Sequence, residues 1–243
     1  MTIIRWGLPV LAALAFSPLA NAAVVNFSTH HSDDDGIVTS ANLAGPNGVA
    51  AGLETWNLPT SNGEPLLSQS GVLDSLGAAT RVGVTFNDLG GPDDWGYNSD
   101  LKLLWRSGRQ FYNGPGNAGS FTINGLDNSA VYDLYIASAH INGTTVGDWT
   151  TANINATAAS LVINNTGNES NGSTWVSGVN YVYFHNVQPI GGNITMTEHV
   201  NNVGNGNDGR VGFNGFQLIS VPEPSVAVLA GFGVLGFLRR RRA

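Results

Sequence analysis

Short apolar runs separated by Asn-Gly pairs determine what the central part of this 243-residue chain can fold into. Asparagine and glycine accept the positive φ angles that tight turns between strands require. Eight such pairs occur, beginning at Asn47, Asn62, Asn113, Asn124, Asn142, Asn171, Asn205 and Asn214. No stretch of the body keeps an apolar period of 3.6 residues, and Lys, Glu and Gln, which favour surface helices, are scarce. We therefore predict one all-β domain, an antiparallel β-sandwich, over residues 23–220.

The predicted strands are apolar or alternating runs of four to ten residues. They cover 24–27, 36–39, 52–57, 80–86, 101–105, 120–123, 131–137, 160–163, 179–184, 193–197 and 210–219. Two of these runs alternate clearly and so indicate which side faces the core. Their apolar members are Val82, Val84 and Phe86 in one run and Tyr132, Leu134 and Ile136 in the other.

The last predicted strand changes parity at Asn214-Gly215. Val211 and Phe213 precede the change, and Phe216 and Leu218 follow it. A bulge with Gly215 at positive φ would return all four side chains to one face. A strand that is buried on both faces is the alternative.

Charge and cysteine content exclude several classes of function. Residues 23–221 carry five basic and sixteen acidic side chains, a formal charge of −11, which disfavours a nucleic-acid partner. Neutral glycans and divalent cations suit this charge better. The chain has no cysteine, so it can form neither disulfides, thiol nucleophiles nor Cys-ligated metal sites.

The first 22 residues have the form of a secretory signal peptide. Arg5 precedes an apolar run, Pro18 interrupts the helix, and Ala20-Asn21-Ala22 provides the small residues that signal peptidase requires. We predict cleavage before Ala23, and hence export of the body.

The last 23 residues, 221–243, combine a stop for the preceding strand with a membrane-directed segment. Two prolines flank Glu223, thirteen uncharged residues follow from 226 to 238, and an arginine cluster comes next. Thirteen helical residues reach about 20 Å, short of the roughly 30 Å hydrocarbon core, so a transient anchor fits better than a permanent one. An ordinary single-pass anchor is the alternative.

This tail resembles the PEP-CTERM sorting signal of exported bacterial proteins, because the Pro-Glu-Pro, the apolar helix and the arginines occur in that order. The resemblance implies recognition by an exosortase, a membrane protease that cuts near the Pro-Glu-Pro. The residues that would be recognised are Pro222, Glu223, Pro224, Arg239, Arg240, Arg241 and Arg242.

A second, weaker resemblance covers most of the body. It is carried by Trp56-Asn57, Leu73-Asp74-Ser75, Ile123-Asn124-Gly125-Leu126, Tyr132-Asp133-Leu134-Tyr135 and Phe213-Asn214-Gly215-Phe216. Together these are similar to exported PEP-CTERM proteins with a body like galactose-binding jelly rolls. The motifs are mainly structural, so they imply a fold rather than an activity.

No catalytic residues are predicted. Gly-x-Ser-x-Gly and His-Glu-x-x-His are absent, and the five histidines lack the spacing of a zinc helix. Glu198 and His199 should point to opposite faces if they lie on a strand. The two carboxylates of a glycosidase cannot be paired from sequence spacing in an all-β fold.

Oxygen-rich loops are candidates for a structural Ca²⁺, at Asp33-Asp34-Asp35, Asp93-Asp94 and 205–208. Because a complete calcium loop is absent, solvated acidic turns are the favoured interpretation, and the metal ligands stay unassigned.

Tryptophans next to acidic side chains are candidate sugar platforms, since aromatic faces stack on sugar rings. The candidate ligand-binding residues are Trp95, Trp149, Trp175, Asp93, Asp94 and Asp148. Core packing is the alternative for each tryptophan, and it is the favoured one for Trp56 and Trp105.

We therefore expect an exported, non-catalytic protein of the cell surface or extracellular matrix that binds exopolysaccharide. Its expected partners are signal peptidase, an exosortase and a polysaccharide, and its contact with the membrane is transient. A secreted carbohydrate-active enzyme and a purely structural, self-associating surface protein are the alternatives.

Overall fold

The computed structural model describes thirteen strands and the turns next to them. The described residues are 24–29, 55–57, 68–87, 89–94, 107–112, 118–138, 144–153, 159–164, 177–178, 181–200 and 210–221. The predicted signal helix within 1–22 and the apolar helix at 226–238 lie outside these ranges. Within them every element is a β-strand, so the all-β prediction is confirmed for the described residues.

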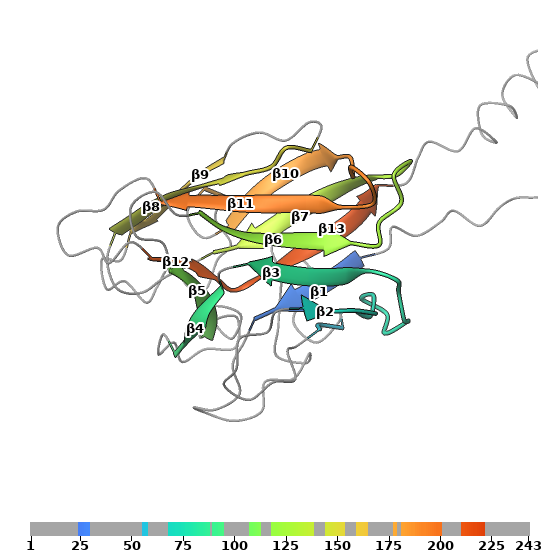
Figure 1. The fold of residues 1–243 in the computed structure, drawn as a ribbon, viewed down its shortest axis with the longest axis horizontal. Coiled ribbons are helices and arrows are strands. Elements are labelled where there is room, and N and C mark those ends of the chain that lie inside the picture. The colour runs from blue at the N-terminus through green and yellow to red at the C-terminus, as the bar shows by residue number, and fades with distance from the viewer. Residues whose placement is uncertain are drawn as a thin grey trace, which may run out of the picture.

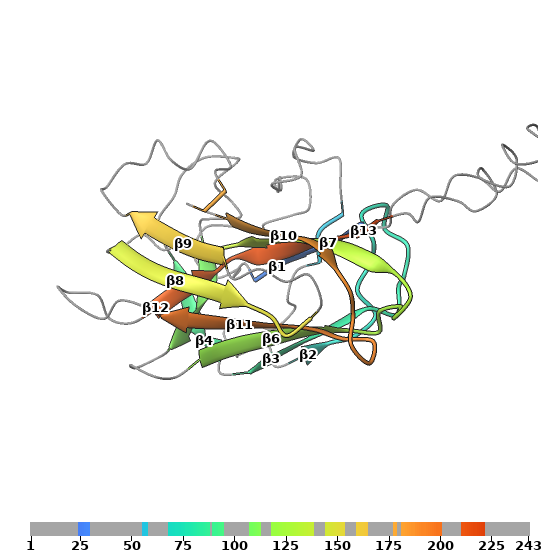
Figure 2. The same cartoon turned by 90° about the horizontal axis from the view of Figure 1, so that it is seen from above.

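Two antiparallel sheets form the body, as expected of a β-sandwich (Figures 1 and 2). The smaller sheet has the order β1 (Val24–Ser28), β13 (Gly215–Val221), β7 (Val131–Ala137) and β10 (Tyr181–Val187). The larger sheet has the order β2 (Ser68–Gln69), β3 (Gly83–Asn87), β6 (Ala118–Asn124), β11 (Ile194–Val200), β8 (Thr144–Thr150) and β9 (Ala159–Asn164).

The chain passes repeatedly between these sheets, which makes the topology compatible with a jelly roll. It crosses at β6 to β7, β7 to β8, β9 to β10 and β10 to β11, and then returns as β13 between β1 and β7. At one side of the sandwich β9 lies next to β10 (Figure 2).

A third, small sheet has the order β12 (Arg210–Phe213), β5 (Ser107–Tyr112) and β4 (Leu89–Asp94). β12 contacts β8 and β11 of the larger sheet. Its residue Phe213 is fully buried, so the last residue of β12 reaches the core of the sandwich.

The core is a cluster of aromatic side chains between the sheets. Phe121 of β6 lies at its centre, with its ring 4.8 Å from that of Phe213, 5.6 Å from Phe216 and 5.7 Å from Trp149. Aliphatic side chains surround these rings, among them Leu134 and Ile136, both fully buried. Burial of apolar area at about 25 cal/mol per Å² makes this cluster the main source of stability in a chain without disulfides.

The inward faces predicted from alternation are confirmed. Val84 and Phe86 are buried and Val82 packs against the core, and the alternating residues Tyr132, Leu134 and Ile136 of β7 are buried as well. In β11, Glu198 is fully buried whereas His199 is exposed, so these neighbours do point to opposite faces.

The parity change at Asn214 is a change of sheet rather than a bulge within one strand. β12 ends at Phe213 and pairs with β5, whereas β13 begins at Gly215 and pairs with β1 and β7. Gly215 has a φ of +155°, as expected, and a Cβ there would overlap the carbonyl oxygen of Phe27. Residues 215–218 are all buried, so the alternative of burial on both faces describes the start of β13.

The predicted strand at 52–57 is wrong for its described part, 55–57, where only Asn57 forms an isolated bridge, to Phe27. The Asn57 side chain donates to the carbonyls of Asn26 and Leu73 and accepts from the Leu73 amide. The Asn57 backbone also donates to the Asn26 carbonyl and accepts from the Ser28 amide, so this one residue links the edge of β1 to the turn at Leu73. The neighbouring Trp56 is buried, as predicted.

Candidate functional site

Ring side chains and one carboxylate gather on the outer face of β7 and β10, the face turned away from the core. Alternation places Asp133 and Tyr135 on this face of β7, and Tyr181, Tyr183 and His185 on the same face of β10. The antiparallel register sets Tyr183 opposite Tyr135, which brings their side chains together. We call these five residues the outer-face cluster.

The rings form a continuous row. Those of Tyr135 and Tyr183 are stacked, with centroids 4.4 Å apart and planes 22° apart. Tyr181 continues the row on one side, 5.9 Å from Tyr135, and His185 continues it on the other, 5.9 Å from Tyr183. These rings lie on the outside of the sheet and do not belong to the core cluster.

A bulge in β10 completes the polar part of the cluster. The register shifts between Phe184 and Val187, and Asn186 adopts a φ of +54°, which asparagine tolerates better than most residues. The Asn186 amide donates to Asp133 Oδ1 at 3.0 Å. The bulge therefore fixes the carboxylate relative to the neighbouring strand.

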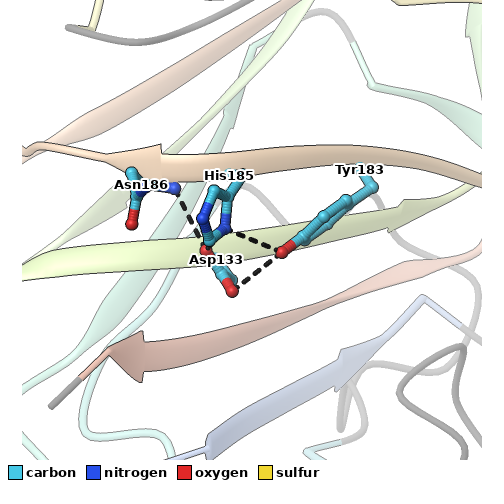
Figure 3. Close-up of polar contacts among 4 residues, drawn as sticks. All are labelled: Asp133, Tyr183, His185 and Asn186. Atoms are coloured by element: carbon cyan, nitrogen blue, oxygen red, sulfur yellow. Dashed lines mark hydrogen bonds and ion pairs between the residues drawn. The ribbon is translucent and has the colours of Figure 1, made fainter.

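Two side chains converge at this carboxylate (Figure 3). His185 Nδ1 lies 2.6 Å from Asp133 Oδ1, and the Tyr183 hydroxyl donates to Asp133 Oδ2 at 2.8 Å. Tyr183 Oη is also 2.9 Å from His185 Nδ1. A proton on Nδ1 would satisfy the contact with Asp133 Oδ1, and the phenol proton satisfies the contact with Asp133 Oδ2.

The carboxylate is sheltered while the imidazole is open to solvent. The side chain of His185 is 58% exposed and that of Asp133 is 17% exposed. Burial raises the pKa of the Tyr183 phenol, and the hydrogen bond and negative charge of Asp133 raise it further. Burial also raises the pKa of the Tyr135 phenol.

Asp133→Asn should lower the pKa of the Tyr183 phenol, because an amide has no negative charge to oppose the phenolate. Alkaline titration followed by phenolate absorbance should show one tyrosine moving to lower pH, and Tyr183→Phe should remove that same step. Asp74→Asn is the control, since the Asp74 carboxylate accepts from the backbone amides of Leu76 and Ala78 in its own turn. If Asp133→Asn leaves the titration unchanged, Asp133 does not control the phenol.

Trp149, predicted as a sugar platform, is instead a core residue. It is fully buried on β8, with its ring in an edge contact with Phe121 at 5.7 Å. A buried ring cannot stack on a glycan, so this prediction is wrong. Asp148 precedes it on β8, opposite His199 of β11.

Trp95 and Trp175 lie outside the described residues, as do Trp105, His30, His31, His140 and the acidic loops at 33–35 and 205–208. Asp93 and Asp94, expected in a turn, lie on β4, where they pair with Gly108 and Ser107 of β5. Pro92 adjoins the irregular part of that pairing, at the sheet edge, where proline is tolerated. In the described part of the chain no three His, Asp or Glu side chains gather around one point.

Sequence reasoning missed the outer-face cluster, although a signal was present. Tyr181, Tyr183 and His185 occur at every second position, as do Asp133 and Tyr135. This spacing places each set on one face of a strand, but it does not show that β7 and β10 are neighbours.

The C-terminal end of the body leads directly into the tail. β13 ends at Val221, opposite Val131, one residue before Pro222. Residues 220–242 match the PEP-CTERM protein-sorting motif. This sorting motif indicates export, transient passage through the membrane and processing by an exosortase.

The sorting motif covers the tail and only the last two residues of β13. A search of curated proteins and a search of solved structures found no match. Among the described residues no helix is long and apolar enough to cross a membrane.

Proposed function

We propose that this protein is a non-catalytic component of the cell surface or extracellular matrix that binds a neutral exopolysaccharide through its outer-face cluster. The sorting motif supports the destination. The row of rings on β7 and β10 is the observation that carries the binding role.

The chemistry of the row suits a sugar. Pyranose rings present apolar C–H faces and polar hydroxyls, so their sites combine aromatic rings with hydrogen-bonding groups. Tyr135, Tyr181 and Tyr183 supply both, and Asp133 and His185 add an acceptor and a ring nitrogen at the end of the row. The formal charge of −11 on residues 23–221 favours a neutral glycan over an anionic one. Trp95 and Trp175 are proposed as further stacking residues.

Glycan binding is favoured over hydrolysis because the outer-face cluster holds a single carboxylate. Glycosidases usually use two, on opposite sides of the bond that breaks. Asp133 is also engaged by three donors, at Tyr183, His185 and Asn186, which ties it to a positioning role.

Affinity electrophoresis through gels containing neutral polysaccharides tests the proposal, with calcium and with chelator. The exported chain should be retarded, and Tyr181→Ala should bind about fivefold more weakly, from the loss of an aromatic contact of about 1 kcal/mol. Leu76→Ala removes a side chain that is 81% exposed and should change nothing. Tyr183→Phe keeps the ring and should retain most of the binding.

Equal retardation of the wild type and Tyr181→Ala would remove the row from the site. No retardation in any gel, together with concentration-dependent assembly in solution, would instead establish the self-associating structural protein. Release of reducing ends from a retained glycan would establish an enzyme.

A further inference from the structure

We propose that Asp133, Tyr183 and His185 bind a first-row transition-metal cation, such as Cu²⁺ or Zn²⁺, on the outside of the sandwich. The donor groups are the Asp133 carboxylate, the Tyr183 phenol oxygen and His185 Nδ1, all presented by two neighbouring strands (Figure 3). It does not depend on glycan binding.

The three groups are close enough to share one cation. His185 Nδ1 lies 2.6 Å from Asp133 Oδ1 and 2.9 Å from Tyr183 Oη, and Tyr183 Oη lies 2.8 Å from Asp133 Oδ2. Ligands at about 2.0 to 2.2 Å from a metal are separated by about 3.0 to 3.4 Å, depending on geometry. Side-chain rotations that move the donor atoms apart by a few tenths of an ångström would therefore admit a cation among the three groups.

The backbone holds the groups in place before any cation arrives. Asp133 lies on β7, while Tyr183 and His185 lie two residues apart on β10, and the paired strands fix the separation of their backbones. The Asn186 amide holds Asp133 Oδ1, and Tyr135 supports the Tyr183 ring by stacking. Contacts of this kind orient metal ligands and keep their conformational freedom low.

The donor types select the class of cation. Imidazole nitrogen favours Zn²⁺, Cu²⁺, Ni²⁺ and iron, whereas Ca²⁺ and Mg²⁺ prefer oxygen donors alone. Three protein ligands leave coordination positions open, and His185, whose side chain is 58% exposed, leaves the site accessible from solvent. Water or a ligand from outside the protein would fill the remaining positions.

Protons are displaced when the cation binds. The phenol proton of Tyr183 passes to solvent, and the imidazole proton moves from Nδ1 to Nε2, which frees Nδ1 to coordinate. One proton is released for each cation bound, and no change of oxidation state is required. Binding should therefore weaken as the pH falls.

Titration of the untagged, exported chain in mild detergent with Cu²⁺ and with Zn²⁺ tests this site. Calorimetry should give one site that is lost, or weakened by at least about tenfold, in both Tyr183→Phe and His185→Gln. The copper complex should show a phenolate-to-copper absorption band that disappears in Tyr183→Phe. Tyr181→Phe is the matched control and should keep both the affinity and the band.

Circular dichroism of each variant establishes that it is folded, and Tyr183→Phe keeps the stacked ring. Unchanged affinity and absorption in both Tyr183→Phe and His185→Gln would overturn the proposal, as would a wild type that binds neither cation. These variants also separate the two proposals. Tyr183→Phe should abolish the metal site while keeping glycan retention, and Tyr181→Ala should do the reverse.

Discussion

Gly125→Ala should destabilise the protein by about 3 kcal/mol, whereas Gly191→Ala should cost only about 1 kcal/mol. Both glycines have left-handed φ angles, +75° and +60°, so both substitutions carry the same backbone penalty of about 1 to 2 kcal/mol. They differ in what the new Cβ would meet. At Gly125 it would overlap the carbonyl oxygen of Arg81, while at Gly191 nothing lies within 4 Å. Forcing an extra methyl group into a packed site adds about 1 to 3 kcal/mol.

Chemical denaturation of the wild type and the two variants measures this difference. Gly125 follows β6 and begins the passage to β7 in the opposite sheet, so the overlap would push the start of this passage away from the segment at Arg81 that leads into β3. Equal losses of stability in the two variants would show that the close approach of Gly125 to Arg81 does not add to the cost of the Gly125→Ala substitution. Because β7 carries Asp133 and Tyr135, the outer-face cluster depends on this junction.

Strands with clear alternation could be predicted from the sequence, and those shaped by pairing could not. The run at 131–137 agrees with β7 residue for residue, and β1, β3, β6, β9, β10 and β11 each overlap a predicted strand. β4 was not predicted, because its sequence Leu-Gly-Gly-Pro-Asp-Asp is typical of a turn. It forms a strand by pairing along one side with β5, which was also missed.

The Asn-Gly pairs show the same limit. They correctly mark where strands end, but neither described pair is a two-residue hairpin. Asn124-Gly125 begins a crossing between sheets, and Asn214-Gly215 moves the chain from the sheet of β5 to that of β1 and β7. The φ preference of the dipeptide is local, whereas the destination of the next strand is set by packing of the whole body.

The candidate site was the least predictable part. The sequence of a tryptophan next to an acidic residue does not show whether the tryptophan is buried or exposed. Trp149 is buried because its neighbours on the inner face are Phe121 and Phe213. Asp133 and His185 are 52 positions apart in the chain. They come together through the register between β7 and β10, and a strand's neighbour in a β-sandwich does not follow from its own sequence.

The position of the sorting motif explains how the body can be released without unfolding. β13 is paired on both sides, with β1 and β7, and its last residue Val221 lies opposite Val131. Pro222 has no N–H to extend this ladder, so the paired strand stops where the Pro-Glu-Pro begins. A cut on the C-terminal side of Val221 therefore removes none of the strands that the structure describes.

Replacement of Pro222, Glu223 and Pro224 by alanine should abolish processing and leave the full-length chain in the membrane fraction. Proline has a fixed φ and no N–H, and Glu223 is the only charged residue between Pro222 and the arginines, so the variant loses the three residues that define the Pro-Glu-Pro of the matched motif. In a host with an active exosortase, immunoblots of the membrane and released fractions with an antibody against the body measure the outcome.

Ser225→Ala, next to the tripeptide, is the control and should be processed normally. Wild-type amounts of shortened, released protein from the triple variant would show that the Pro-Glu-Pro is not the processing signal. Retention of a folded body in the membrane fraction would show that the tail alone determines release, because none of the three substituted residues lies within β13.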